Sequence, residues 1–138
     1  MFQKEFFCQT SGEEEIVDIT GPVRDLIIES GISNGLCSVF VMGSTAAITT
    51  IEYEEGVLRD LNRALSILAP SNADYAHDAR WGDGNGRSHV KAALVGPSLS
   101  IPVRERNPVL GTWQQIVLLE LDIRTKRERR IMVTIFGE

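Results

Sequence analysis

The stretch that does most to decide the fold is Trp113-Gln114-Gln115-Ile116-Val117-Leu118-Leu119-Glu120-Leu121-Asp122-Ile123. Its alternation predicts one long strand, because successive side chains of a strand point to opposite faces of the sheet. One face carries Trp113, Val117, Leu119, Leu121 and Ile123, and the other carries Gln114, Ile116, Leu118, Glu120 and Asp122. A second strand is expected over Arg129–Phe136, and the basic turn between the two predicts a long hairpin.

Upstream of this hairpin the pattern predicts more strands than helices. Leu36–Met42 is almost continuously apolar, which is typical of a strand covered on both faces. In Val57–Leu68 the apolar residues, Leu68 included, fall on one helical face. The other expected strands are Phe2–Thr10, Glu14–Ile19, Ala46–Glu52 and Leu99–Val103, and a second helix is expected over Thr20–Gly31. Ser88–Val95 is expected as a helix, with a strand as the alternative. Strands in clusters with few helices indicate an α+β fold with mainly antiparallel sheet.

Length and composition predict a single globular domain over residues 1–138, with 43% hydrophobic and 24% charged residues. A net charge of -5 argues against nucleic acid as a partner. The apolar runs are too short to cross a membrane, and a secretory signal is not evident, so we expect a cytoplasmic protein. Cys8 and Cys37 lack metal-ligand spacing and are expected to be strand or core residues.

The run Arg124–Arg130 holds five basic residues and one acid. A solvated hairpin that shields a sheet edge explains it most simply, since charge runs usually form wet surface. The alternative is a rim that attracts a phosphorylated small molecule.

The segment Trp81–His89 concentrates reactive residue types at the end of a long polar loop, Ser71–Gly86. Such long loops are usually functional or disordered. Alternating glycines let the backbone approach a ligand, and a helix that begins near Arg87 would add a partial positive charge for phosphate at Asn85 and Gly86. The alternative is a turn that carries a surface histidine.

Two histidines lie in or next to this loop. His89 suits metal ligation or proton transfer, and Asp83 suits a divalent cation. His77 is the only other histidine, and together with His89 it would make an open metal site. A lone surface histidine is the competing interpretation for each.

Four polar residues outside the loop are further candidates. Ser44 and Thr45 lie between two strands, where their hydroxyls would hold phosphate oxygens or cap the turn. Glu52 ends a strand and is either a site carboxylate or part of a solvated acidic face. Gln114 begins a strand, and its amide would orient a heteroaromatic ring or face water.

Several short sequence blocks follow one another along the chain in the same order as in a known protein family. They are Ser44–Thr49 with Glu52, Tyr75–His77, Asp83–Gly86 with Ser88-His89, Gly96–Val103 and Leu110–Ile116. Together they resemble the YjbQ-type family of small uncharacterised proteins, and Gly111-Thr112-Trp113-Gln114 is the most specific of the blocks. The resemblance implies packed antiparallel sheets in a sandwich with two or three helices, a homotrimer, and in some members a secondary thiamine-phosphate synthase activity.

The chain departs from that family at two positions. Many relatives carry histidine at the position of Gly43, and some carry it at the position of Arg87. The resemblance therefore implies that a three-histidine site for Mg²⁺ or Zn²⁺ would keep only His77 and His89 here. Arg87 instead offers a bidentate cation suited to phosphate.

The leading hypothesis is a small-molecule enzyme or binder that acts on a phosphorylated heterocycle, with thiamine-phosphate synthase-like transfer as its most concrete form. Expected catalytic residues are His89, Asp83 and Glu52, and expected substrate-binding residues are Ser44, Thr45, Asn85, Gly86, Arg87 and Gln114. Two alternatives stay open: a metal-dependent hydrolase, and a non-catalytic oligomeric module that binds a metabolite or protein.

Overall fold

The computed structural model describes residues 1–138 and contains eight strands and four helices. The strands are β1 (Phe2–Thr10), β2 (Ile16–Asp18), β3 (Gly35–Val41), β4 (Ala46–Ile51), β5 (Ser98–Arg104), β6 (Asn107–Pro108), β7 (Gln115–Glu120) and β8 (Arg127–Gly137). The helices are α1 (Thr20–Ser30), α2 (Glu55–Leu68), α3 (Ala76–Trp81) and α4 (Gly86–Val95). No helix is long and apolar enough to cross a membrane.

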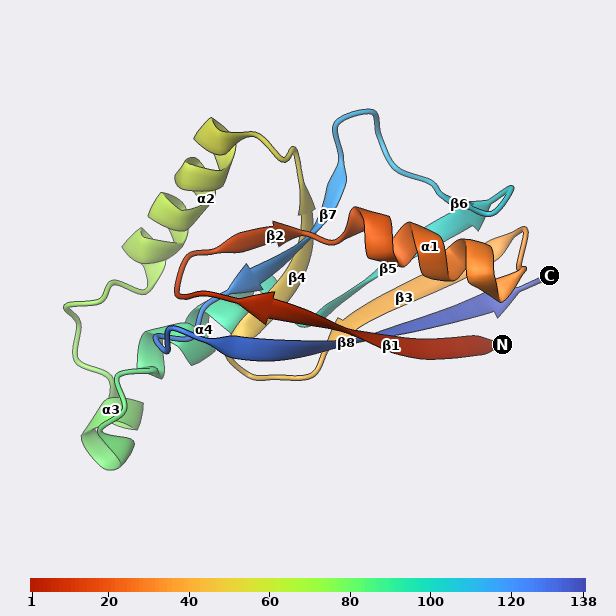
Figure 1. Ribbon diagram of the computed structural model, residues 1–138. Helices are drawn as coiled ribbons and strands as arrows, with labels where there is room; N and C mark the ends of the chain where they lie inside the picture. The colour runs from red at the N-terminus through yellow and green to blue at the C-terminus, as the bar shows by residue number, and fades with distance from the viewer.

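Two antiparallel sheets form the frame of the molecule (Figure 1). The larger has the order β1-β8-β3-β5-β6, and the smaller has the order β2-β7-β4. β1 and β8 pair along their whole length, from Phe2 opposite Ile135 to Thr10 opposite Arg127, so the two chain ends lie side by side. The expected α+β class with packed antiparallel sheets is confirmed, with one helix, α3, beyond the two or three expected.

The core lies in two layers on either side of the smaller sheet. The larger cluster of 17 buried residues joins the inner face of the five-stranded sheet, α1 and one face of β7 through residues such as Ile116 and Leu118. The second cluster joins the other face of β7, through Val117 and Leu119, to Leu65 of α2 and Ala92 of α4. β7 is therefore buried on both faces, because helices cover the side that the larger sheet does not.

The predicted hairpin between the last two strands is wrong. β7 pairs with β2 and β4, whereas β8 pairs with β1 and β3, so the basic turn carries the chain from one sheet to the other. The strand itself is shorter than expected, since Trp113 and Gln114 lie before β7 and Leu121–Ile123 lie after it. The alternation of apolar and polar residues predicted which face of a strand is buried, but it did not predict which strand pairs with it.

Three other expectations need correction. β3 is covered on one face only, because Leu36 and Phe40 are 44% and 41% exposed. The segment Ser71–Gly86 is not a continuous loop, since α3 forms inside it. β2 spans only Ile16–Asp18 of the expected strand Glu14–Ile19. Phe2–Thr10 has the expected bounds, and α1 ends as expected at Gly31, which adopts a left-handed φ of 71°.

Candidate functional site

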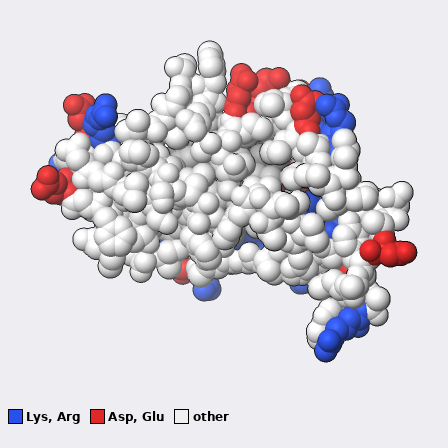
Figure 2. All heavy atoms as spheres, turned by 180° about the vertical axis from the view of Figure 1, so that it is seen from behind, with Lys and Arg blue, Asp and Glu red and all other residues white.

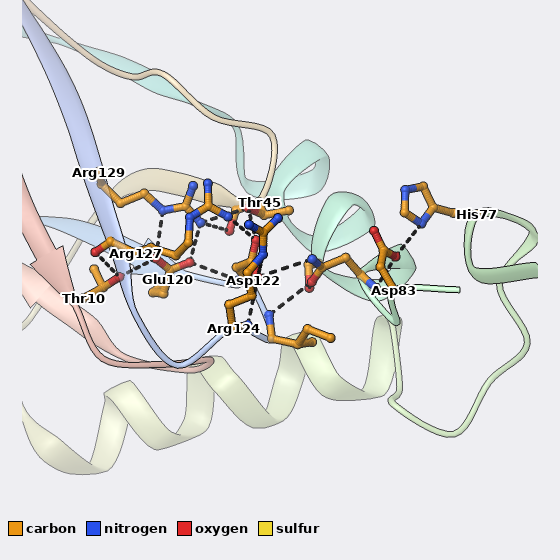
Figure 3. Close-up of polar contacts among 12 residues, drawn as sticks. Thr10, Thr45, His77, Asp83, Glu120, Asp122, Arg124, Arg127 and Arg129 are labelled. Atoms are coloured by element: carbon orange, nitrogen blue, oxygen red, sulfur yellow. Dashed lines mark hydrogen bonds and ion pairs between the residues drawn. The ribbon is translucent and has the colours of Figure 1, made fainter. Parts of the chain in front are cut away.

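His77 lies between two carboxylates at the junction of α3 and α4. Its Nδ1 is 3.2 Å from Oδ1 of Asp78 and 3.3 Å from Oδ1 of Asp83. Because both neighbours are acceptors, we assign the ring proton of neutral His77 to Nδ1, which leaves the lone pair on Nε2 free for proton transfer or a metal. Figure 3 shows His77 with its ring turned toward Asp83.

The start of α4 fixes both carboxylates. The backbone N–H of Gly86 donates to Asp78 over 2.8 Å, and that of Asn85 donates to Asp83 over 3.0 Å. Burial works to raise the pKa of Asp78, but the hydrogen bonds from Gly86 and His77 hold it below its ordinary value. The backbone amides at the start of α4 were expected to bind phosphate. In the structure they donate to carboxylates of the protein itself.

His89 connects this pair to an open hollow. The rings of His77 and His89 lie 4.6 Å apart between centroids and are tilted by 49°. His89 lines a solvent-open hollow of about 430 Å³, together with Gly43, Ser44, Ala46, Ala92, Ala93 and Pro97. The fold thus brings Ser44, His77, Asp83 and His89 to one place, from the β3–β4 turn and from the α3–α4 junction.

A buried polar network lies next to the hollow (Figure 3). Arg129 donates from Nε to Glu120 over 2.8 Å and from Nη2 to the same carboxylate, and Nη2 also donates to Oγ1 and O of Thr45 over 2.9 and 3.0 Å. The Thr45 hydroxyl donates to Asp122 over 2.9 Å, and the Thr10 hydroxyl donates to Glu120 over 2.6 Å. Each carboxylate is compensated by a buried or half-buried arginine.

Asn85 joins this network to the histidine pair. Its side chain donates to Asp122 over 3.3 Å and accepts from Ser88 over 2.9 Å, while its backbone N–H holds Asp83. A line of hydrogen bonds therefore runs from Glu120 to Asp83, whose Oδ1 lies 3.3 Å from Nδ1 of His77. Disturbance of the network is expected to move the histidines.

The network keeps both of its acids ionised. Burial acts to raise the pKa of Glu120, but donors from Arg129, Thr10 and the backbone of Asp122 lower it below the ordinary value of 4.5. Burial likewise opposes ionisation of Asp122, and hydrogen bonds from Arg124, Thr45 and Asn85 lower its pKa below 3.8. Each acid is thus an acceptor at neutral pH.

Several expected substrate contacts make hydrogen bonds within the protein. The guanidinium of Arg87 donates to both oxygens of Glu13 over 2.8 and 2.9 Å, and this bonding raises its pKa above its ordinary value. Thr45 and Asn85 are buried in the network. Ser44, by contrast, is exposed at the edge of the hollow.

Glu52 and Gln114 lie at the opposite end of β4 from Ser44. Gln114 donates to Oγ1 of Thr50 over 3.0 Å, and Glu52 directly follows the last residue of β4. Because a strand rises by about 3.3 Å per residue, the length of β4 separates these two residues from the Ser44 end of the strand by roughly 15–20 Å. Gln114 lines a second hollow of about 420 Å³. Within one chain, then, the expected site is divided between two places.

Asp78 and the partners of Arg129 were not predicted from the sequence. The interpretation of Arg124–Arg130 as a solvated hairpin is wrong for Arg129, which is 1% exposed. One signal was present: Glu120 lies on the same strand face as Ile116 and Leu118, directly before a basic run. Because a buried acid needs a paired base, that pattern predicts an internal ion pair.

The comparisons with known proteins agree on one family. The family model "UPF0047 protein YjbQ-like" matches residues 4–138. A UPF0047 protein of Methanothermobacter thermautotrophicus is 39% identical over 138 residues, which cover 100% of this chain and 94% of that protein.

Solved structures give the same result. The crystal structure of a YbjQ-like protein of unknown function from Sulfolobus solfataricus is 37% identical, with a TM-score of 0.87, and the match covers 99% of this chain and 100% of that chain. A hypothetical protein of Aeropyrum pernix is 30% identical, with a TM-score of 0.90 and 100% of both chains covered.

Proposed function

The chain belongs to the YjbQ family of UPF0047 proteins, and from that premise we propose that it binds a phosphorylated small molecule beside His89 and acts on it by proton transfer. The observation that supports this most is the histidine pair. Nδ1 of His77 is held by Asp78 and Asp83, and its ring packs against His89, which lines the hollow. A histidine with one nitrogen held by a carboxylate presents a defined lone pair at the other nitrogen, as general acid–base chemistry requires.

The family resemblance and the hollow both support this choice of substrate class. A phosphorylated heterocycle of the thiamine-phosphate type would place its phosphate near the exposed Ser44 and its ring against the apolar lining. In a transfer that joins a pyrimidine diphosphate to a thiazole phosphate, the pyrimidine methylene loses diphosphate and bonds to the thiazole nitrogen. His89 would donate a proton to the departing diphosphate, with His77 behind it.

The direct test is an assay for thiamine phosphate from the two precursors, with Mg²⁺ present. We expect product from the wild type and about a hundredfold less from His89→Gln, since removal of a general acid typically costs 10²–10⁴-fold in rate. His77→Gln is expected to be impaired as well, whereas Asp25→Asn, which changes an exposed acid on α1, serves as the matched control. No product from the wild type would contradict the transfer reaction.

A metal-dependent hydrolase is the second candidate, and one observation favours it. Ligand atoms of His77, Asp78 and Asp83 lie within 4.8 Å of one another. One imidazole and two carboxylates suit Zn²⁺ or Mn²⁺. The third ligand in this set is Asp78, whereas His89 was the ligand expected from the sequence. Elemental analysis and titration with Zn²⁺ and Mg²⁺ test it: stoichiometric metal that is lost in Asp78→Asn and Asp83→Asn would favour this reaction, and no affinity would exclude it.

We also propose that the chain assembles as a homotrimer through the outer face of the five-stranded sheet. That face carries Leu36 opposite Phe136 and Phe40 opposite Met132, with Phe7 on the neighbouring strand β1. Charged side chains also gather at the margins of the face in Figure 2, around a broad uncharged area. Assembly is one way for Glu52 and Gln114 of one copy to approach His89 of another. A trimer without turnover would favour the non-catalytic binding module.

A further inference from the structure

One end of the Arg129 guanidinium has no partner in the protein. The side chain is 1% exposed, and its Nε and Nη2 are bonded to Glu120 and Thr45, but Nη1 has no hydrogen-bond partner. A buried donor without an acceptor costs about 1–3 kcal/mol, and such atoms in folded proteins usually have a water or ligand partner. Nη1 therefore indicates an acceptor that comes from outside the chain.

Gly43 is the neighbour of this atom that also lines the hollow. A Cβ built on Gly43 would lie 2.9 Å from Nη1 of Arg129, and apart from Cζ at 4.0 Å it would meet nothing else within 4 Å. The φ of Gly43 is not in the left-handed region, so the backbone does not require glycine here. Nη1 is closed to solvent and Arg129 does not line the hollow, so Gly43, which lines it with Ser44 and His89, is the residue that connects the two.

The charges around Nη1 favour an anion over a neutral acceptor. Arg129 faces Glu120, while Asp122 faces both Arg127 and Arg124, so three guanidinium groups stand against two carboxylates. Both oxygens of Glu120 already accept from Arg129, Thr10 or backbone, which leaves no protein acceptor for Nη1. Arg124, which supplies the excess, is 67% exposed, and Nη1 of Arg129 is the one buried side-chain donor without a partner.

We propose that Nη1 of Arg129, reached past Gly43, binds the phosphate group of the small molecule that occupies the hollow, with Ser44 at its edge. This assigns the phosphate to Arg129 in place of Arg87, whose guanidinium is bonded to Glu13. The inference rests on the proposed function for its choice of hollow, and it adds the group that recognises the ligand.

The experiment is a calorimetric titration of inorganic phosphate into the full chain. We expect saturable binding by the wild type and at least tenfold weaker binding by Gly43→Ala, because the new methyl group would lie against Nη1. Gly21→Ala is the matched control, since a Cβ there meets nothing within 4 Å, and it is expected to bind like the wild type. No saturable binding by the wild type, or equal binding by Gly43→Ala, would overturn the inference.

A second measurement needs no substitution and covers the case in which Gly43→Ala does not fold. In ¹⁵N spectra of the wild type, the Nη resonances of Arg129 are expected to move as phosphate is added; fixed resonances would overturn the inference. His89→Gln separates this inference from the proposed reaction. Phosphate binding that depends on Gly43 without any turnover would keep the anion subsite and reject the reaction. Turnover that depends on His89, together with equal phosphate binding by the wild type and Gly43→Ala, would keep the reaction and reject the anion subsite.

Discussion

Among single residues, the buried pair of Arg129 and Glu120 is expected to matter most for stability. Glu120→Gln keeps the shape of the side chain but leaves the guanidinium charge uncompensated in the interior. We expect a loss of about 3–5 kcal/mol in the free energy of unfolding, measured by urea denaturation. Glu128→Gln changes an exposed acid in the next strand and should cost less than about 0.5 kcal/mol. Equal stability of the two variants would show that the pair is not formed.

The same network predicts how stability depends on pH. Glu120 and Asp122 have folded pKa values below their ordinary values of 4.5 and 3.8, so the unfolded chain binds more protons than the folded one in acid. Their contribution is complete above those ordinary values and is lost as pH falls through the folded values. Urea denaturation at pH 7, 5, 4 and 3 should show a falling free energy of unfolding below about pH 5. A free energy that rises or stays flat over this range would contradict the network.

For single residues, the sequence predicted which residues gather at the site more accurately than it predicted the partner that each one contacts. His77, Asp83, His89 and Ser44 were named and do lie together. Arg87, Thr45 and Asn85 were named as ligand contacts, but their polar groups are bonded to Glu13 or to the network. Pairing of this kind depends on the meeting of segments far apart in sequence, which local pattern does not encode.

Among the helices, α2 shows which buried residues helical periodicity predicts and which it does not. Leu65 and Leu68 were both expected on the apolar face, but only Leu65 packs against β7, and Leu68 is 67% exposed. Leu65→Ala should cost about 2–4 kcal/mol in the free energy of unfolding, because it leaves a cavity. Leu68→Ala in the same helix should cost less than about 0.5 kcal/mol. The reverse order in denaturation midpoints would contradict the placement of α2.

The junction of α3 and α4 positions the histidines, and Gly86 makes it possible. A Cβ on Gly86 would lie 2.5 Å from Cβ of Tyr75, so no larger residue fits without displacement of α3. Gly86→Ala is expected to cost about 1–3 kcal/mol and to move the ring resonances of His77 in NMR spectra. Gly21→Ala, with open space around it, should change neither. An unchanged His77 signal in Gly86→Ala would show that this contact does not fix the site.

The presence of strands and helices was predicted more accurately than the pairing of the strands. Phe2–Thr10 and the helix closed by Gly31 carry their own signals, alternation and a left-handed C-terminal glycine. The expected hairpin of the last two strands failed because Leu121 and Asp122 are buried where the chain leaves one sheet for the other. α3 was missed because its six residues are too few to show a period, and none of them is buried.

For the whole molecule, the assembly is the main prediction. Sedimentation should give three times the chain mass of 15.3 kDa. Phe40→Glu, on the outer face of the five-stranded sheet, should give monomers, because it puts a charge into the proposed contact. Ile28→Glu changes an equally exposed apolar residue on α1 and should leave the trimer intact. A wild type that sediments as a monomer would contradict the assembly.

The central claim is that a phosphorylated small molecule binds beside His77 and His89, and histidine NMR tests it most directly. The chain has only these two histidines, so each ring signal can be assigned from His77→Gln or His89→Gln. On titration with thiamine phosphate, we predict saturable shifts of both ring signals, and the same titration of Gly43→Ala should need at least tenfold more ligand. Saturable binding that leaves both ring signals unmoved, with shifts confined to the hollow around Gln114, would contradict the account.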